Sequence, residues 1–135
     1  MEIRIHYNGG VEFTADARGH RVLCDQPASN GGTDTGMTPP ELLLASLGTC
    51  AAYYAAQYLK NHGLQPQGLE VGVSADKEQR PARLARFRID VTAPGLPPDH
   101  EPGLLRAVNA CLIKNTLAQS PAIETTVHAA DRVPA

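Results

Sequence analysis

Residues 38–62 read Thr-Pro-Pro-Glu-Leu-Leu-Leu-Ala-Ser-Leu-Gly-Thr-Cys-Ala-Ala-Tyr-Tyr-Ala-Ala-Gln-Tyr-Leu-Lys-Asn-His, the longest stretch that is both rich in helix formers and mainly apolar. Thr38 and Glu41 have the spacing of a capping box and Pro39 suits the first helical position, so a helix is predicted to begin here. Gly63 is expected to end it. Because apolar residues fall on nearly every side, the helix is predicted to be the buried centre of the fold.

The whole chain has the length and composition of one globular domain, residues 1–135. A net charge of −2 and an aromatic content of 4% give no reason to expect nucleic acid as a partner. No segment resembles a signal peptide or a membrane span, so no membrane partner is predicted. Three cysteines are too few and too uneven for a secreted disulfide framework, which favours a cytoplasmic location.

Short alternating segments flank the central helix. Strands are predicted at residues 2–7, 11–15 and 20–25 before it, and at 69–75 and 84–91 after it. A second helix is expected from Glu101 to about Leu117, followed by a last strand at Ile123–His128 and a frayed end at Asp131–Ala135. The predicted order is βββ-α-ββ-α-β with antiparallel pairs, which is the α+β class.

Two cysteines, Cys50 and Cys111, lie on the apolar sides of the two predicted helices. Two neighbouring thiols can reduce a peroxide, because a thiolate attacks it, becomes a sulfenic acid and is resolved by the second thiol as a disulfide. The alternative is that both are small buried hydrophobic residues. Cys50 lies in the middle of its helix, far from that helix's N-terminus, so a nearby cation is expected to be needed to lower its pKa.

Other candidate groups have simpler interpretations. Cys24 ends a strand beside Asp25, whose charge opposes thiolate formation, so it is interpreted as structural. Glu41 is nine residues before Cys50 and on the opposite side of an ideal helix, which favours the capping role. The five histidines have no metal-ligand spacing, so neither a metal nor another cofactor is predicted.

Three blocks of sequence carry a family resemblance. They are Val22–Pro27 leading through Gly31-Gly32, then Thr38–Cys50, and then Ala110–Ile113 with Thr116-Leu117 and Pro121. In this order the blocks resemble the OsmC/Ohr family, the osmotically inducible protein C and organic hydroperoxide resistance proteins. The resemblance implies an OsmC-like fold, with antiparallel sheets wrapped around two central helices, and an intertwined homodimer.

The resemblance also implies a function, that of a cofactor-free thiol peroxidase. Cys50 matches the peroxidatic nucleophile of the family and Cys111 the resolving thiol. The implied substrates are organic hydroperoxides, and a dithiol such as a lipoyl group recycles the disulfide. The competing hypothesis is a non-catalytic dimer that binds a small molecule or senses redox state, with a ligand cleft lined by Tyr53 and Tyr54 and the cysteines in structural or sensing roles.

The sequence departs from the hydroperoxide-resistance branch at one position. That branch carries an arginine directly after the Gly-Gly of the first hairpin, where this chain has Val11. Arg18 and Arg21, on the next turn and strand, are the candidates to replace it. The spacing from Glu41 to Cys50 is also one residue shorter, so the chain resembles the less characterised OsmC-like branch.

Overall fold

A computed structural model describes residues 1–132. Its elements are β1 (Arg4–Gly9), β2 (Glu12–Ala17), β3 (His20–Cys24), η1 (Ala28–Asn30), α1 (Pro39–Asn61), β4 (Glu70–Glu78), β5 (Arg83–Thr92), η2 (Pro98–His100), α2 (Glu101–Asn109) and α3 (Leu112–Ala118). The strands form two antiparallel sheets, ordered β1-β2-β3 and β4-β5. The predicted α+β class with antiparallel pairing is therefore confirmed.

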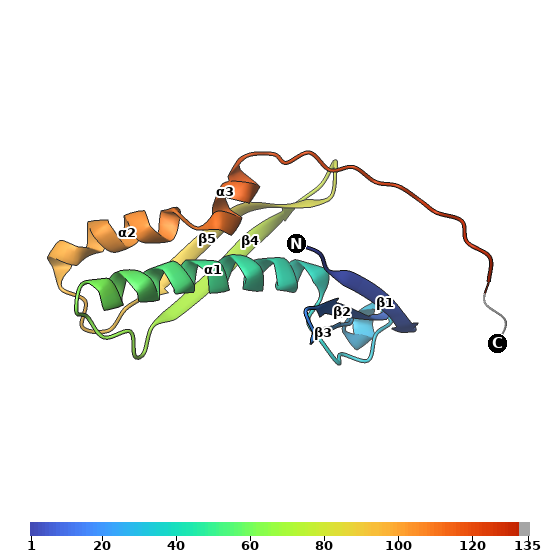
Figure 1. The fold of residues 1–135 in the computed structure, drawn as a ribbon, viewed down its shortest axis with the longest axis horizontal. Helices are drawn as coiled ribbons and strands as arrows, with labels where there is room; N and C mark the ends of the chain where they lie inside the picture. The colour runs from blue at the N-terminus through green and yellow to red at the C-terminus, as the bar shows by residue number, and fades with distance from the viewer. Residues whose placement is uncertain (133–135) are drawn as a thin grey trace.

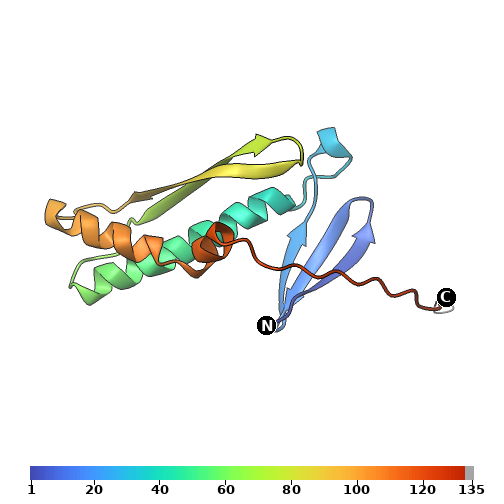
Figure 2. The same ribbon diagram turned by 90° about the horizontal axis from the view of Figure 1, so that it is seen from above.

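The elements form an elongated arrangement around α1 (Figure 1). Helix α2 lies alongside α1, and the β4–β5 hairpin covers one side of both (Figure 2). The β1–β3 sheet lies at the end of the molecule where α1 begins, so in this chain the sheets do not surround the helices. Among residues 1–132, no helix has the length and apolar character needed to cross a membrane.

Both ends of α1 follow the sequence signals. The Thr38 backbone N–H donates to Glu41 Oε1 at 2.9 Å, and the Glu41 N–H donates to Thr38 Oγ1 at 3.4 Å, which completes the predicted capping box. At the other end Gly63 has a φ of 67°, and the Leu64 N–H donates to the Leu59 carbonyl at 2.8 Å. This is the Schellman arrangement that a glycine after the last helical turn permits.

The core is a single stripe of α1 packed against α2 and the hairpin. Its buried residues are Leu47, Ala51, Ala55 and Leu59 on α1, with Leu104 and Val108 on α2. Spacings of four residues place the α1 set on one side of the helix, where small alanines let α2 approach closely. The prediction of a helix buried all round is wrong for this chain, because Tyr53 on another side of α1 is 62% exposed.

The predicted second helix is two helices. Helix α2 ends at Asn109, and the N–H groups of Ala110 and Cys111 donate to the carbonyls three residues earlier, which tightens the last turn. Cys111 then has a ψ of 130°, an extended conformation, and α3 begins at Leu112. The chain changes direction at Cys111.

The predicted last strand is also absent from this chain. Residues 119–132 carry no regular secondary structure and extend away from the helices (Figure 1). A strand needs a neighbour to receive its backbone hydrogen bonds, and no strand of residues 1–118 lies against this segment. Ile123 and Val127 are consequently 84% and 91% exposed. Of the predicted frayed end, residues 133–135 lie outside the described part of the chain.

The loop between β3 and α1 is organised by one buried carboxylate, that of Asp25, which is only 1% exposed. It accepts hydrogen bonds of 2.8–3.1 Å from the N–H groups of Gln26, Thr33 and Thr35 and from the hydroxyls of Thr33 and Thr35. The bond from the Thr35 backbone, followed by the one from Gln26, holds the pKa of this carboxyl well below its usual range. The loop between β3 and α1 is therefore held in one conformation by hydrogen bonds to the ionised Asp25 carboxylate.

We expect Asp25→Asn to lower the melting temperature by several degrees at neutral pH. The amide replaces one carboxylate oxygen, an acceptor, with an NH₂ group, which cannot accept the hydrogen bonds that the loop N–H and hydroxyl groups donate. Since the folded-state pKa is depressed, the contribution of Asp25 is fully present above about pH 4 and is lost as the pH falls through the folded-state pKa. Thermal melts at neutral and at acidic pH measure both effects. Asp34→Asn, an exposed change in the same loop, is the control; equal melting temperatures for the two variants contradict the prediction.

Candidate functional site

The structure brings Cys50 and Cys111 together. Cys50 projects from the middle of α1 and Cys111 lies at the break between α2 and α3, and the two thiols are within hydrogen-bonding reach. Cys50 is half-buried and Cys111 has no exposed surface, and neither is in a disulfide. One thiol can therefore meet a solute while the other is shielded behind it.

Backbone N–H groups at the start of α3 lie close to the two sulfur atoms. Those of Ile113 and Leu112 act to lower the pKa of Cys50, and those of Lys114 and Ile113 act in the same direction on Cys111, which makes no side-chain capping bond to α3. These donors are free for this role because the first N–H groups of a helix have no carbonyl partner within it. The break at Cys111 is what places the start of a helix against Cys50.

These contacts separate the pKa values of the two thiols. Burial raises the pKa of Cys50, but hydrogen bonds from the Cys111 thiol and from the Ile113 and Leu112 N–H groups outweigh it, so the pKa is lowered overall. Burial, followed by the hydrogen bond to Cys50, raises the pKa of Cys111. Cys50 is thus the thiol that ionises first, with Cys111 as a protonated donor beside it. Backbone N–H groups of another helix lower this pKa and no cation is among its causes in residues 1–132, so the expectation that a cation activates Cys50 stays a prediction.

The two arginines proposed as helpers lie elsewhere in the chain. Arg18 is exposed in the β2–β3 turn, and Arg21 on β3 donates from Nε to Asp16 Oδ1 at 3.0 Å. Neither is among the groups in residues 1–132 that shift the pKa of Cys50. Glu41 likewise stays in the capping box, where bonds from the Thr38 backbone and then its hydroxyl lower the pKa of the carboxyl.

The two tyrosines have different surroundings. Tyr53 is exposed, and its ring meets that of Tyr54 edge-on at 5.5 Å between centroids. Tyr54 is half-buried and lines a groove of about 670 Å³ against α3, with Leu112 and Asn115 on the opposite wall. Of the two predicted cleft tyrosines, Tyr54 lies beside α3 and Tyr53 is exposed to solvent.

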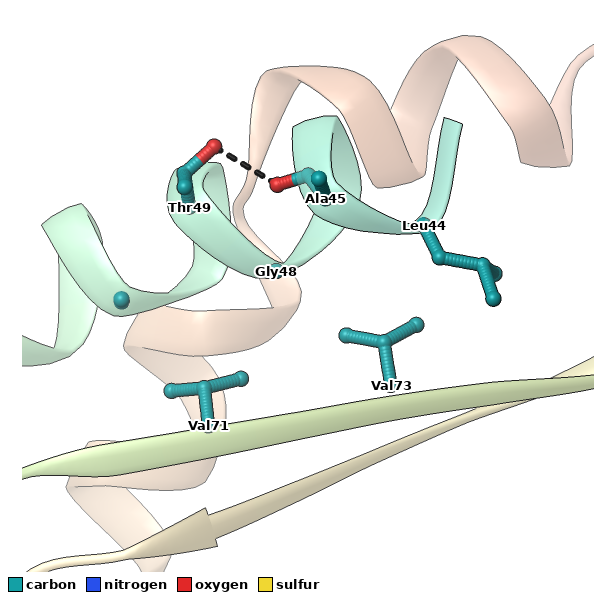
Figure 3. Close-up of a pocket in the computed structure, with 7 residues that line it drawn as sticks. Leu44, Ala45, Gly48, Thr49, Val71 and Val73 are labelled. Atoms are coloured by element: carbon teal, nitrogen blue, oxygen red, sulfur yellow. Dashed lines mark hydrogen bonds between the residues drawn. The ribbon is translucent and has the colours of Figure 1, made fainter. Parts of the chain in front are cut away.

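Another hollow, of about 310 Å³, lies between α1 and β4 (Figure 3). Its walls include Leu44, Gly48, Val71 and Val73, and none of its lining residues is titratable. The Thr49 hydroxyl donates to the Ala45 carbonyl at 2.8 Å and so satisfies a helix carbonyl. This hollow offers packing surface and no reactive group.

Sequence reasoning missed Leu112 and Ile113 as site residues. They contribute through their backbone N–H groups, which every residue except proline carries, so their side chains give no signal. The one observable hint is that Cys111 begins the block Cys-Leu-Ile-Lys, which a helix break could turn toward Cys50.

Comparisons with known proteins show the family of the chain. A family model described as OsmC-like protein matches residues 32–126, and the chain belongs to that family. The match spans α1, both thiols and the β4–β5 hairpin. Among curated proteins, none matches the chain significantly.

Solved structures show the same fold. A protein from Psychrobacter arcticus, named for osmotic stress induction and detoxification response, has a TM-score of 0.77 at 18% identity, covering 84% of this chain and 85% of its own. An OsmC-like protein from Mycoplasma pneumoniae has a TM-score of 0.73 at 18% identity, covering 88% and 87%. An organic hydroperoxide resistance protein from Elizabethkingia anophelis has a TM-score of 0.63 at 16% identity, covering 89% and 90%. The resemblance to the OsmC/Ohr family is confirmed.

We expect Cys111→Ala to raise the pKa of Cys50, because the alanine removes a donor that stabilises the thiolate. Cys111→Ser keeps a hydroxyl donor and should hold the Cys50 pKa nearer to its wild-type value. Thiolate absorbance near 240 nm, followed from pH 5 to 10, measures this, with Cys50→Ser identifying the relevant step. Identical titrations of Cys50 in wild type and in the alanine variant would show that the Cys111 thiol does not set its pKa.

Proposed function

We propose that the protein is a thiol-dependent peroxidase that reduces organic hydroperoxides. The observation that carries the proposal is the thiol pair: a half-buried Cys50 with a lowered pKa beside a buried, protonated Cys111. A low-pKa, accessible thiol next to a resolving thiol is the arrangement that peroxide reduction by cysteine requires. The organic hydroperoxide resistance proteins of the same fold support the choice of substrate.

The proposed reaction has three balanced steps. The Cys50 thiolate attacks the outer peroxide oxygen, the O–O bond breaks, and the leaving alkoxide takes a proton to become an alcohol. The Cys111 thiol then attacks the Cys50 sulfenic acid, forming a disulfide and releasing water. A dithiol reductant of the lipoyl type opens that disulfide by exchange and is itself oxidised. No cofactor is involved, and a reducing compartment suits three free cysteines.

The backbone donors have a defined part in the first step. The Ile113 and Leu112 N–H groups lower the pKa of Cys50, so the main chain stabilises the thiolate before a peroxide arrives. Such preorganised donors act without a side chain having to move into place. This assigns to α3 the stabilising role for which Arg18 and Arg21 were considered.

We expect reduced wild-type protein to consume cumene hydroperoxide in the presence of dihydrolipoamide, and Cys50→Ser to reduce the rate at least 100-fold. Cys24→Ser is the matched control, because Cys24 lies at the end of β3, and it should keep the wild-type rate. Coupled assays of NADH oxidation through lipoamide dehydrogenase follow the turnover. Equal rates in wild type and Cys50→Ser would instead favour the binding or sensing role.

We further propose that the protein works as an intertwined homodimer. Ile3, which precedes β1, and Ile5 and Tyr7 on β1 fall on alternate positions and are 58–66% exposed, and Ile123 and Val127 are exposed on the C-terminal segment. Apolar side chains exposed in this number are typical of a surface that a partner covers. A second copy supplies a neighbour for the segment that has none in this chain.

We expect the wild-type protein to elute as a dimer in size-exclusion chromatography with light scattering, and Val127→Asp to shift it toward monomer. Thr126→Asp places the same charge on the neighbouring position, which faces the other way in an extended segment, and should stay dimeric. A monomeric wild type, or the same mass for both variants, contradicts the assignment of this segment to the interface.

A further inference from the structure

The groove that Tyr54 lines is next to the thiol pair. Ala110 and Leu112, the residues on either side of Cys111, form part of its wall, and Tyr54 lines it from α1. The rest of its lining is mainly polar and comprises Asn115, Thr116, Gln119 and Pro121. With a volume of about 670 Å³, the groove can admit a small solute beside the thiols.

The side chain of Tyr54 extends toward the turn of α1 that carries Cys50. Tyr54 follows Cys50 by four residues, so the two lie on the same side of the helix, one turn apart. A long side chain in a helix points back toward the N-terminus of the helix and covers the preceding turn. The edge-on contact of its ring with that of Tyr53 favours one orientation of the ring.

The hydroxyl of Tyr54 has no hydrogen-bond partner within residues 1–132. In the same part of the chain, the hydroxyl of Tyr7 donates to the Gly10 carbonyl and that of Tyr58 is hydrogen-bonded to His100 Nδ1. No side-chain oxygen or nitrogen there is buried without a partner, so the Tyr54 hydroxyl is in reach of solvent. Tyr54 therefore brings a free O–H donor to the groove.

The first step of the proposed reaction needs such a donor, because an alkoxide is a poor leaving group unless it receives a proton. During the attack the sulfur, the attacked oxygen and the leaving oxygen come into line. The leaving oxygen is therefore on the side of the peroxide away from Cys50. Cys111 has no exposed surface and lies behind the Cys50 sulfur, so its thiol is not placed at that oxygen. The proton has to come from the groove.

We propose that Tyr54 is the general acid that protonates the leaving alkoxide. The Cys50 thiolate bonds to the outer, hydrogen-bearing oxygen, and the O–O bond breaks with its electron pair going to the inner oxygen. The Tyr54 hydroxyl passes its proton to that oxygen, which leaves as the alcohol. The tyrosinate then regains a proton from solvent. This inference rests on the proposed peroxidase function and adds a catalytic residue to it.

The test compares two oxidants that differ in their leaving group. Cumene hydroperoxide releases an alkoxide, which needs a proton, whereas peracetic acid releases acetate, which needs none at neutral pH. Tyr54→Phe removes only the hydroxyl. It should slow the oxidation of Cys50 by cumene hydroperoxide about 100-fold and keep the rate with peracetic acid within about twofold of wild type. Rapid-quench alkylation counts the unreacted Cys50 thiol in a single turnover, so the recycling dithiol does not affect either rate.

Tyr58→Phe is the matched control, because it removes from the same helix a hydroxyl that is bonded to His100, and it should keep both wild-type rates. Equal slowing with both oxidants in Tyr54→Phe would show a structural effect and overturn the inference. Unchanged rates with both would overturn it as well, and in either case the peroxidase function stands. If neither oxidant reacts with Cys50 in the wild type, the proposed function and this inference are both overturned.

Discussion

Burial of one stripe of α1 is the constraint on which the rest of the structure depends. Ala51 and Ala55 have no exposed surface and pack with Leu104 and Val108 of α2 in the main cluster. Their short side chains bring α2 close, and the hairpin packs partly buried residues against the same cluster. Cys50 precedes Ala51 in the chain, so the packing that fixes the helices also fixes the thiol at the edge of the core.

The sequence predicts those features of the fold that side chains determine locally. The capping box at Thr38 and Glu41 and the glycine end at Gly63 depend on residues a few positions apart, and both are confirmed. The break at Cys111 has no such signal, because neither proline nor glycine lies there and the apolar spacing runs on unbroken. The Ile123–His128 segment alternates like a strand, yet a strand also needs a partner, which alternation does not supply.

The candidate site likewise has a part that the sequence predicts and a part that it does not. Cys50 and Cys111 are found from residue type and family blocks, because their chemistry resides in their side chains. Their activation resides in the main chain, in N–H groups that a continuous helix would have used for its own carbonyls. A search of the sequence for a charged group that could lower the pKa of Cys50 therefore selects arginines. The main-chain groups that lower it are the peptide N–H groups of α3.

The loop fixed by Asp25 has a further consequence, which concerns the entropy of association. Because five donors converge on this carboxylate, the loop between the β1–β3 sheet and α1 is held in one conformation. A flexible joint would let the exposed strand face sample many orientations, and each binding event would have to select one of them. The fixed loop makes that selection during folding, so in the proposed dimer the strand face would be oriented before the second copy binds.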